Sequence, residues 1–436
     1  MNVKTQFRKY VSQNIMGMIG LSCYILADSF FIAKSQGANG LTALNLVLPL
    51  YNLIFSFGSM IGVGSAIRYA VTKYKDAKEA DTYLFNALFF TTIFGIAFCL
   101  AGFFGAEQIM TLLGADEVIR ETGAVYTRIF MLFSPFFMWN YVVNAYVRND
   151  GAPTMAMIAT LSSSLFNIVF DYILMFPLHM GMAGAALATA LSPVIGIVIC
   201  LIHLLSKKSQ VKLKVCMPSI SKLLKSCQLG VAAFVGEMSS GIITLAFNFL
   251  ILGLAGNVGV AAYGVVANIS LVAVSIFNGI AQGSQPLISE NYGKGRRAEV
   301  HILRNMSFRL SLLLAAILYT LLFLGAESIT GIFNHDQNVV FAQYATTGMK
   351  LYFLGIFFSG LNIVGSSFFA ATEKAKAAFT ISILRGFVLI LLFAFILAAI
   401  WGMNGVWLSY AVAEGCVSVI MLGILVAEKK RSSTFV

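Results

Sequence analysis

Two aspartates, Asp28 and Asp171, lie inside long apolar runs of this sequence. Asn167 precedes Asp171 by four residues, so both side chains share one face of a helix. An ionisable group in mid-bilayer costs at least about 2.5–3.5 kcal/mol, so it must face a cavity or a partner. Two carboxylates with amide and hydroxyl oxygens suit a hard cation such as Na⁺, or a shared proton. We predict a coupling site for Na⁺ or H⁺ with these ligands: Asp28, Asn167, Asp171 and Thr189.

Two glutamates, Glu237 and Glu414, also lie within apolar runs. We expect them to line a cavity and to attract positively charged cargo. The alternative for all four acids is that each packs against a neighbouring helix as a polar brace. The four histidines all lie outside the middle of these runs, which argues against a histidine proton relay.

The composition excludes a soluble fold. Hydrophobic residues form 59% of the 436 residues and charged residues 11%, against about 45–50% and 25% in soluble domains. We therefore expect an all-α integral membrane protein. The basic N-terminus leads into an apolar run without a cleavage site, so we expect the first span to be retained. Six scattered cysteines form no CxxC pair, which indicates neither a metal site nor a disulfide framework.

Twelve apolar runs are long enough to cross a bilayer, which needs about 20 residues per helix. We expect membrane-spanning helices over residues 11–33, 43–71, 84–105, 123–147, 154–176, 182–205, 226–254, 259–289, 303–325, 345–371, 377–400 and 404–427. Glycine and polar residues interrupt many of these runs, which is typical of helices that pack tightly and line a cavity.

The positive charges predict the orientation. If the N-terminus is cytoplasmic, 25 of the 29 lysines and arginines fall on the cytoplasmic side. This asymmetry follows the positive-inside rule and predicts that both termini are cytoplasmic. It also accounts for the net charge of +11 without a nucleic-acid partner. Four arginines inside the spans are expected near their cytoplasmic ends: Arg68, Arg148, Arg309 and Arg385.

The chain repeats itself at an offset of about 220 residues. Gly64 falls on Gly283 at an offset of 219, and Gly181 falls on Gly402 at an offset of 221. Each half holds six spans, an even number, so the two repeats share one orientation about an axis along the membrane normal. Two such repeats around a central cavity are the usual architecture of a secondary transporter.

The repeat also predicts the domains: a six-span first lobe over residues 1–206, a cytoplasmic linker over 207–221 and a six-span second lobe over 222–436. The second lobe lacks the predicted coupling site, since Leu392 stands at the counterpart of Asp171 and Tyr410 at that of Thr189. This difference indicates a function confined to the first lobe.

Several stretches resemble the multidrug and toxic compound extrusion (MATE) family: the Asp28 region, the Asn167 to Asp171 pattern, Gly181 to Thr189, and Gln285 to Gly293. The resemblance covers essentially the whole chain. It implies two six-helix bundles in a V shape around a central cavity, and export of mostly cationic, amphipathic drugs in exchange for Na⁺ or H⁺.

The resemblance also bears on individual residues. In the branch with an amino-lobe cation site, the predicted coupling residues match, and the family's asparagine in the fourth span aligns best with Asn144, with Asn140 as its rival. Residues 11–33 lack the proline at which family members bend this helix. Residues 345–371 contain no acid, which argues against the branch with a second carboxylate there, although Glu237 matches an acidic position of that branch.

Other functional classes find less support. The chain has neither a P-loop nor a catalytic constellation, so we expect no ATPase and no enzyme. A lipid-linked precursor flippase is the alternative, but its cavity would need several cations, whereas here acids hold the middle of the spans. We expect a monomeric antiporter in a bacterial cytoplasmic membrane. It would export lipophilic cations, including antibiotics, with the coupling ion as its only cofactor.

Overall fold

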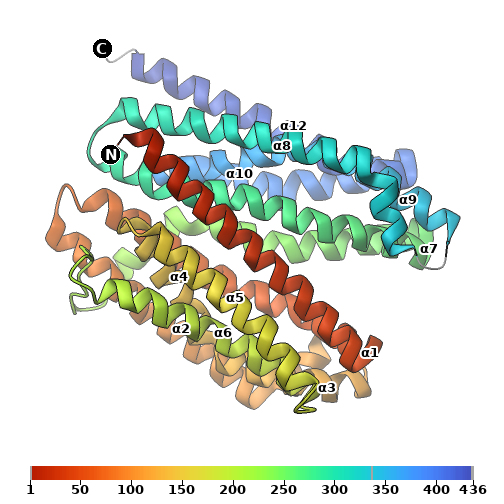
Figure 1. Ribbon diagram of the computed structural model, residues 1–436. Coiled ribbons are helices and arrows are strands. Elements are labelled where there is room, and N and C mark those ends of the chain that lie inside the picture. The colour runs from red at the N-terminus through yellow and green to blue at the C-terminus, as the bar shows by residue number, and fades with distance from the viewer. Residues whose placement is uncertain (1, 335–336, 434–436) are drawn as a thin grey trace.

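The computed structural model describes residues 2–334 and 337–433, and all regular secondary structure within them is helical (Figure 1). The first lobe contains α1 (Val3–Thr72), α2 (Ala77–Leu112), α3 (Glu117–Leu132), α4 (Ser134–Asn149), α5 (Pro153–Met175) and α6 (Gly181–Leu204). The second lobe contains α7 (Ile220–Gly293), α8 (Arg297–Phe333), α9 (Val339–Tyr352), the 3₁₀ turn η1 (Phe353–Gly355), α10 (Ile356–Ala371), α11 (Ala375–Ile383), the π-helical turn η2 (Leu384–Val388) and α12 (Leu389–Ser433).

These elements form twelve spans. Nine described helical segments are long and apolar enough to cross a membrane, and two of them, Ile220–Gly293 and Ala375–Ala427, hold two spans each. The twelfth span is the pair α3 and α4. Here the sequence predicted one helix over 123–147, but the helix breaks at Phe133 because Pro135 follows and lacks the N–H that would continue it. The first span is helical up to Gly37.

Four glycines make the turns between consecutive spans at one end of the protein. Gly37 and Gly256, 219 residues apart, have φ of 65° and 62°, and Gly181 and Gly402, 221 apart, have φ of 54° and 56°. Only glycine adopts positive φ at little cost. The two repeats therefore use the same residue for the same backbone turn, which confirms the duplication predicted from the sequence.

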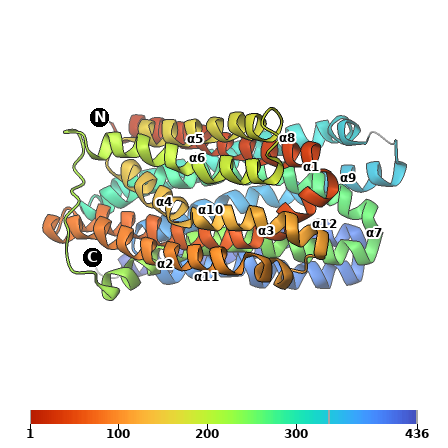
Figure 2. The ribbon, with the colours of Figure 1, turned by 90° about the horizontal axis from the view of Figure 1, so that it is seen from below.

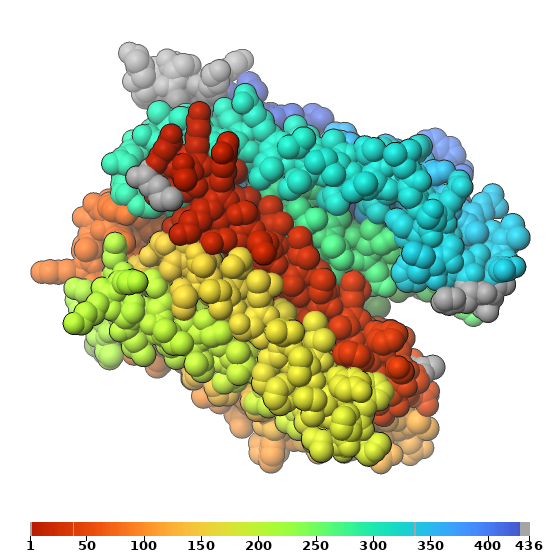
Figure 3. Space-filling model, viewed as in Figure 1, coloured from red at the N-terminus to blue at the C-terminus, as the bar shows by residue number. Residues whose placement is uncertain are grey.

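The two lobes form a V. In Figure 1 the first lobe (red to yellow-green) and the second (green to blue) lie together at the end that holds the N-terminus. They diverge toward the ends of α3 and α9, where Figure 3 shows a hollow between them. Figure 2 shows the helices running along one common direction, with the connection from α6 to α7 crossing at the N-terminal end. We call the end that holds the N-terminus, where the lobes lie together, the closed end. The opposite end, where the lobes diverge, is the open end.

Glycines let the lobes approach each other at the closed end. A Cβ added at Gly64 would lie 2.0 Å from the Ser226 carbonyl oxygen of α7. One added at Gly283 would lie 2.7 Å from the Val11 Cα of α1, and one at Gly230 would lie 1.8 Å from a backbone oxygen of α1. Small residues at such crossings bring backbones into van der Waals contact, the main attraction between helices in a bilayer. The contact is reinforced by a buried core in which Phe7 and Ile67 pack among second-lobe side chains.

Candidate functional site

Asp28 and Asp171 meet inside the first lobe. Asp28 lies nine residues, about 14 Å, before Gly37 at the end of the first span, and Asp171 lies four residues, about 6 Å, before the end of α5 at Met175. The Asp171 side chain is fully buried and Asp28 is 7% exposed. Their carboxyl groups lie close enough to each other to interact electrostatically. The structure thus brings together the two aspartates that the sequence grouped in one predicted site.

Asn167 and Thr189 join this pair. The Asn167 amide nitrogen donates a hydrogen bond to the Thr189 hydroxyl at 3.2 Å, and both residues are buried. Asn167 lies one turn from Asp171 on α5, whereas Thr189 comes from α6. Three helices, α1, α5 and α6, therefore supply the four side chains that the sequence grouped.

Several oxygens of this cluster lack a donor. The Asn167 Oδ1, one oxygen of Asp28 and both oxygens of Asp171 are buried and accept no hydrogen bond within the described part of the chain. Buried polar atoms are normally satisfied, and two carboxylates side by side repel each other when both are ionised. Carboxylate and amide oxygens are hard ligands, so this donor set fits Na⁺, and the carboxyl pair equally fits a shared proton. We name these four residues (Asp28, Asn167, Asp171 and Thr189) the carboxylate cluster.

Three tyrosines surround the carboxylate cluster, and sequence analysis did not find them. Tyr24 lies within electrostatic range of both aspartates, and Tyr126 contacts Thr189 and lies within electrostatic range of Asp28. The Tyr51 and Tyr126 hydroxyls hydrogen-bond to each other. These residues gave no sequence signal because a tyrosine in an apolar run reads as core or membrane interface. They add phenolic O–H groups to the surroundings of the carboxylate cluster.

Asn144 lies outside the carboxylate cluster. Its amide donates to Thr160 Oγ1 at 3.3 Å and to a backbone carbonyl at 3.4 Å. Thr160 precedes Asn167 by seven residues, two turns toward the closed end. Its rival Asn140 packs against Gly196, two turns past Thr189 in the same direction. The alignment with the family's asparagine therefore does not bring a ligand of the fourth span to the aspartates.

Glu237 lies between the lobes. The Tyr141 hydroxyl of α4 donates to Glu237 Oε1 of α7 at 3.2 Å, and Glu237 also interacts with Tyr24. Phe57 and Phe234 form an edge-on ring contact between the same two lobes, with centroids 5.5 Å apart. This half-buried carboxylate thus faces the first lobe at the boundary where the lobes meet.

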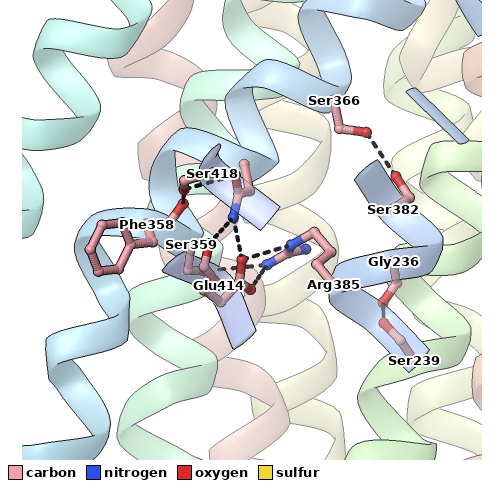
Figure 4. A network of polar contacts seen from close by, with 10 residues as sticks. Gly236, Ser239, Phe358, Ser359, Ser366, Ser382, Arg385, Glu414 and Ser418 are labelled. Atoms are coloured by element: carbon pink, nitrogen blue, oxygen red, sulfur yellow. Dashed lines mark hydrogen bonds and ion pairs between the residues drawn. The ribbon is translucent and has the colours of Figure 1, made fainter. Parts of the chain in front are cut away.

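Glu414 is paired, contrary to the role of free cavity acid predicted for it. Arg385 Nη2 donates to Glu414 Oε1 at 2.7 Å, and the Asn362 amide donates to Oε2 at 2.6 Å (Figure 4). Arg385 also contacts Ser359. The prediction that Arg385 lies near the cytoplasmic end of its span is wrong too. Arg385 lies in η2, ten residues after the start of α11, and its side chain contacts a carboxylate on α12. The pair neutralises itself and acts as a brace of the second lobe.

The comparisons with known proteins identify the family. The MatE family model matches residues 14–173 and 232–396, more than half of the chain. The chain belongs to the MATE family. MATE proteins are membrane transporters of small molecules, so this protein is a multi-pass membrane transporter and not an enzyme.

Relatives of the chain span nearly its full length. It is 26% identical to the multidrug export protein MepA of Staphylococcus saprophyticus over 395 residues, which cover 90% of this chain and 86% of that protein. It is also 26% identical to MepA of Staphylococcus aureus strain MRSA252, over 92% of this chain and 88% of that one. Both of these relatives are bacterial proteins.

Solved structures establish the twelve-helix fold. An outward-facing multidrug resistance MATE transporter of the MOP superfamily superimposes with a TM-score of 0.91, at 20% identity, over 99% of this chain and 97% of that one. A MOP superfamily transporter from Pyrococcus furiosus, described as having a binding pocket of reverse polarity and a different function, reaches 0.88 at 20% identity, over 97% and 94%. One fold thus accompanies pockets of opposite polarity, so the cargo must be argued from the charges of this chain.

Proposed function

We propose that this MATE protein exports lipophilic, mostly cationic drugs in exchange for Na⁺ or H⁺. The observation that carries the proposal is the carboxylate cluster, where two buried aspartates meet with donor-free oxygens around them. Carboxylates in this state bind a cation or a proton in preference to remaining charged and unpaired. The multidrug export assigned to the MepA relatives supports the choice of cargo.

The loading of the carboxylate cluster would bias the arrangement of the lobes. Asp28 sits on α1, which also carries the closed-end residue Val11, and Asp171 sits on α5. Neutralising the aspartates removes their repulsion and lets α1, α5 and α6 pack more closely. Such a local change of charge and packing is how an ion switches a two-state transporter. With both termini cytoplasmic, the open end faces outside and is the end through which drug leaves.

Glu237 would give the proposed cavity a negative charge. It is a carboxylate at the lobe boundary, flanked by the rings of Tyr141 and Phe234. An acid among aromatic rings attracts a lipophilic cation by charge and by contact with the ring faces. A flippase for lipid-linked precursors would instead need free cations here. Arg385, a buried basic side chain of the second lobe, is already neutralised by Glu414.

Transport in proteoliposomes tests this function. The full chain is reconstituted, and movement of a fluorescent lipophilic cation such as ethidium is followed while a Na⁺ gradient or a pH gradient is imposed separately. We expect at least one of the two gradients to drive ethidium against its concentration. Absence of transport under both gradients, together with rescue of a flippase-deficient strain, would replace the proposal by the flippase alternative.

A further inference from the structure

Arg148 is a buried cation that pairs with no carboxylate among residues 2–334 and 337–433. It lies in the last turn of α4 and is 9% exposed. Its Nη1 donates to the Gln282 Oε1 at 2.5 Å, and its Nε donates to no acceptor within the described residues. Two other arginines do have a carboxylate partner. Arg68 pairs with Glu373 across the lobe contact, and Arg385 pairs with Glu414 inside the second lobe. Arg148 has a neutral glutamine where those arginines have an acid.

A small polar cavity adjoins this guanidinium. Its volume is about 20 Å³, and its polar lining consists of Gln13, Asn14, Arg148, Thr160 and Gln282. A space of this size holds about one water molecule or one monatomic ion. The Asn14 and Thr160 side chains donate to backbone carbonyls, and the Gln282 oxygen is occupied by Arg148. Among the described residues, the Gln282 amide nitrogen and the Arg148 Nε are donors with no hydrogen-bond acceptor, and a pair of free donors suits an anion.

Charge decides between a water molecule and an anion. A buried guanidinium needs a counter-charge, because removing a cation from water costs several kcal/mol and a neutral water does not repay it. The carbonyl end of α4 carries only about half an elementary negative charge, and Arg148 sits beside it. A monovalent anion in the cavity would more than cover the missing half charge.

We propose that this cavity binds a small inorganic anion, chloride under physiological conditions, between Arg148 and Gln282. The lining comes from both lobes, since Arg148 and Thr160 belong to the first lobe and Gln282 to α7 of the second. Separation of the lobes at the closed end divides the site. A ligand that binds one arrangement only stabilises that arrangement by mass action, so chloride holds the closed end together. This inference goes beyond the proposed transport function and involves none of the residues of the carboxylate cluster.

Bromide locates the anion directly. Crystals of the full-length protein grown in sodium bromide should show an anomalous peak within contact distance of the Arg148 guanidinium and the Gln282 amide. The bromide concentration is the one that saturates the effect on stability described below. Electron density in the cavity without an anomalous signal would then indicate a bound water and overturn the proposal.

Thermal unfolding in sodium chloride against sodium gluconate, at equal ionic strength, gives a second readout. Both salts contain the same Na⁺, so the carboxylate cluster is equally loaded. We expect chloride to raise the unfolding midpoint by about 2–4 °C, in a saturable manner. In Gln282→Glu the new carboxylate takes the place of the anion. The unfolding midpoint of this variant should therefore be the same in gluconate as in chloride. Arg148→Gln should lose the response as well.

A matched control removes a different polar contact between the lobes. Ser22 donates to Ser275 at 2.6 Å across the same boundary and lies outside the cavity lining. Ser22→Ala should therefore retain the full chloride response. An equal response in wild type, Ser22→Ala and Gln282→Glu would show a general salt effect and sink the proposal, as would no response in the wild type.

Discussion

Gly64 and Gly283, 219 residues apart, occupy equivalent places in the two repeats, and each lies against the backbone of the opposite lobe. Gly64 faces Ser226 and Gly230 of α7, while Gly283 faces Tyr10 and Val11 of α1. The offset of 219 also relates Val11 to Gly230. The contact of Gly64 with Gly230 and the contact of Gly283 with Val11 are therefore equivalent under the pseudo-symmetry of the repeat. The glycine motif that shows the duplication in the sequence is thus the element that joins the lobes at the closed end.

This contact predicts the effect of adding one methyl group. A Cβ at position 64 would lie 2.0 Å from a backbone oxygen, which no side-chain rotation relieves. Gly64→Ala should destabilise the closed end by about 1–3 kcal/mol, the usual cost of overpacking, and reduce transport accordingly. Spin-label distances between the lobes should show a larger separation at that end.

The control for this prediction is Gly236→Ala on α7, where an added Cβ meets nothing within 4 Å. It should leave both the transport rate and the interlobe distances unchanged. Equal behaviour of the two variants would mean that the glycine contact does not govern the closed end.

The Arg385–Glu414 pair makes a separate prediction about stability. The Glu414 side chain is 3% exposed, so Glu414→Gln leaves a buried guanidinium with a neutral partner. Losing one partner of a buried pair costs about 3–5 kcal/mol, whereas replacing both partners by apolar residues costs much less. Arg385→Met combined with Glu414→Met should therefore be more stable than either single variant, as measured by thermal unfolding in detergent. If Glu414→Gln kept wild-type stability but lost cargo binding, Glu414 would instead be assigned to the substrate cavity.

The sequence predicted the parts of the fold that depend on local composition. Twelve spans follow from runs of apolar residues, and the two aspartates of the carboxylate cluster stand out because carboxylates are expensive in lipid. Chain order did not show which side chains meet across helices. Glu414 looked free because its partner lies 29 residues earlier on another element, and the hydroxyls of Tyr51 and Tyr126 meet across 75 residues. The proline at 135, by contrast, was a visible local signal for the break between α3 and α4.

Membrane orientation is the next prediction. The excess of basic residues near the closed end predicts that this end is cytoplasmic. In a variant with its six native cysteines replaced by serine, Lys212→Cys and Arg296→Cys should react with an impermeant maleimide only from the cytoplasmic side. Val118→Cys, 60% exposed on α3 near the open end, should react only from outside. Reversed labelling of all three would invert the proposed direction of transport.

The carboxylate cluster gives the last prediction. Asp28→Asn and Asp171→Asn each fix one member of the pair in an uncharged state, so the site can no longer alternate between ionised and loaded forms. Each variant should lower gradient-driven efflux by about 5- to 150-fold, the range of a coupling free energy of about 1–3 kcal/mol. Neither should lower the thermal midpoint, because the substitution removes repulsion between buried like charges.

Leu392→Met is the matched control, since Leu392 is the repeat counterpart of Asp171 and stands half-exposed on α12. It should transport as the wild type does. Retention of near-normal, ion-coupled efflux by either aspartate variant would remove the carboxylate cluster from the mechanism. Glu237 would then be the carboxylate to test first, because Glu414 is already committed to Arg385.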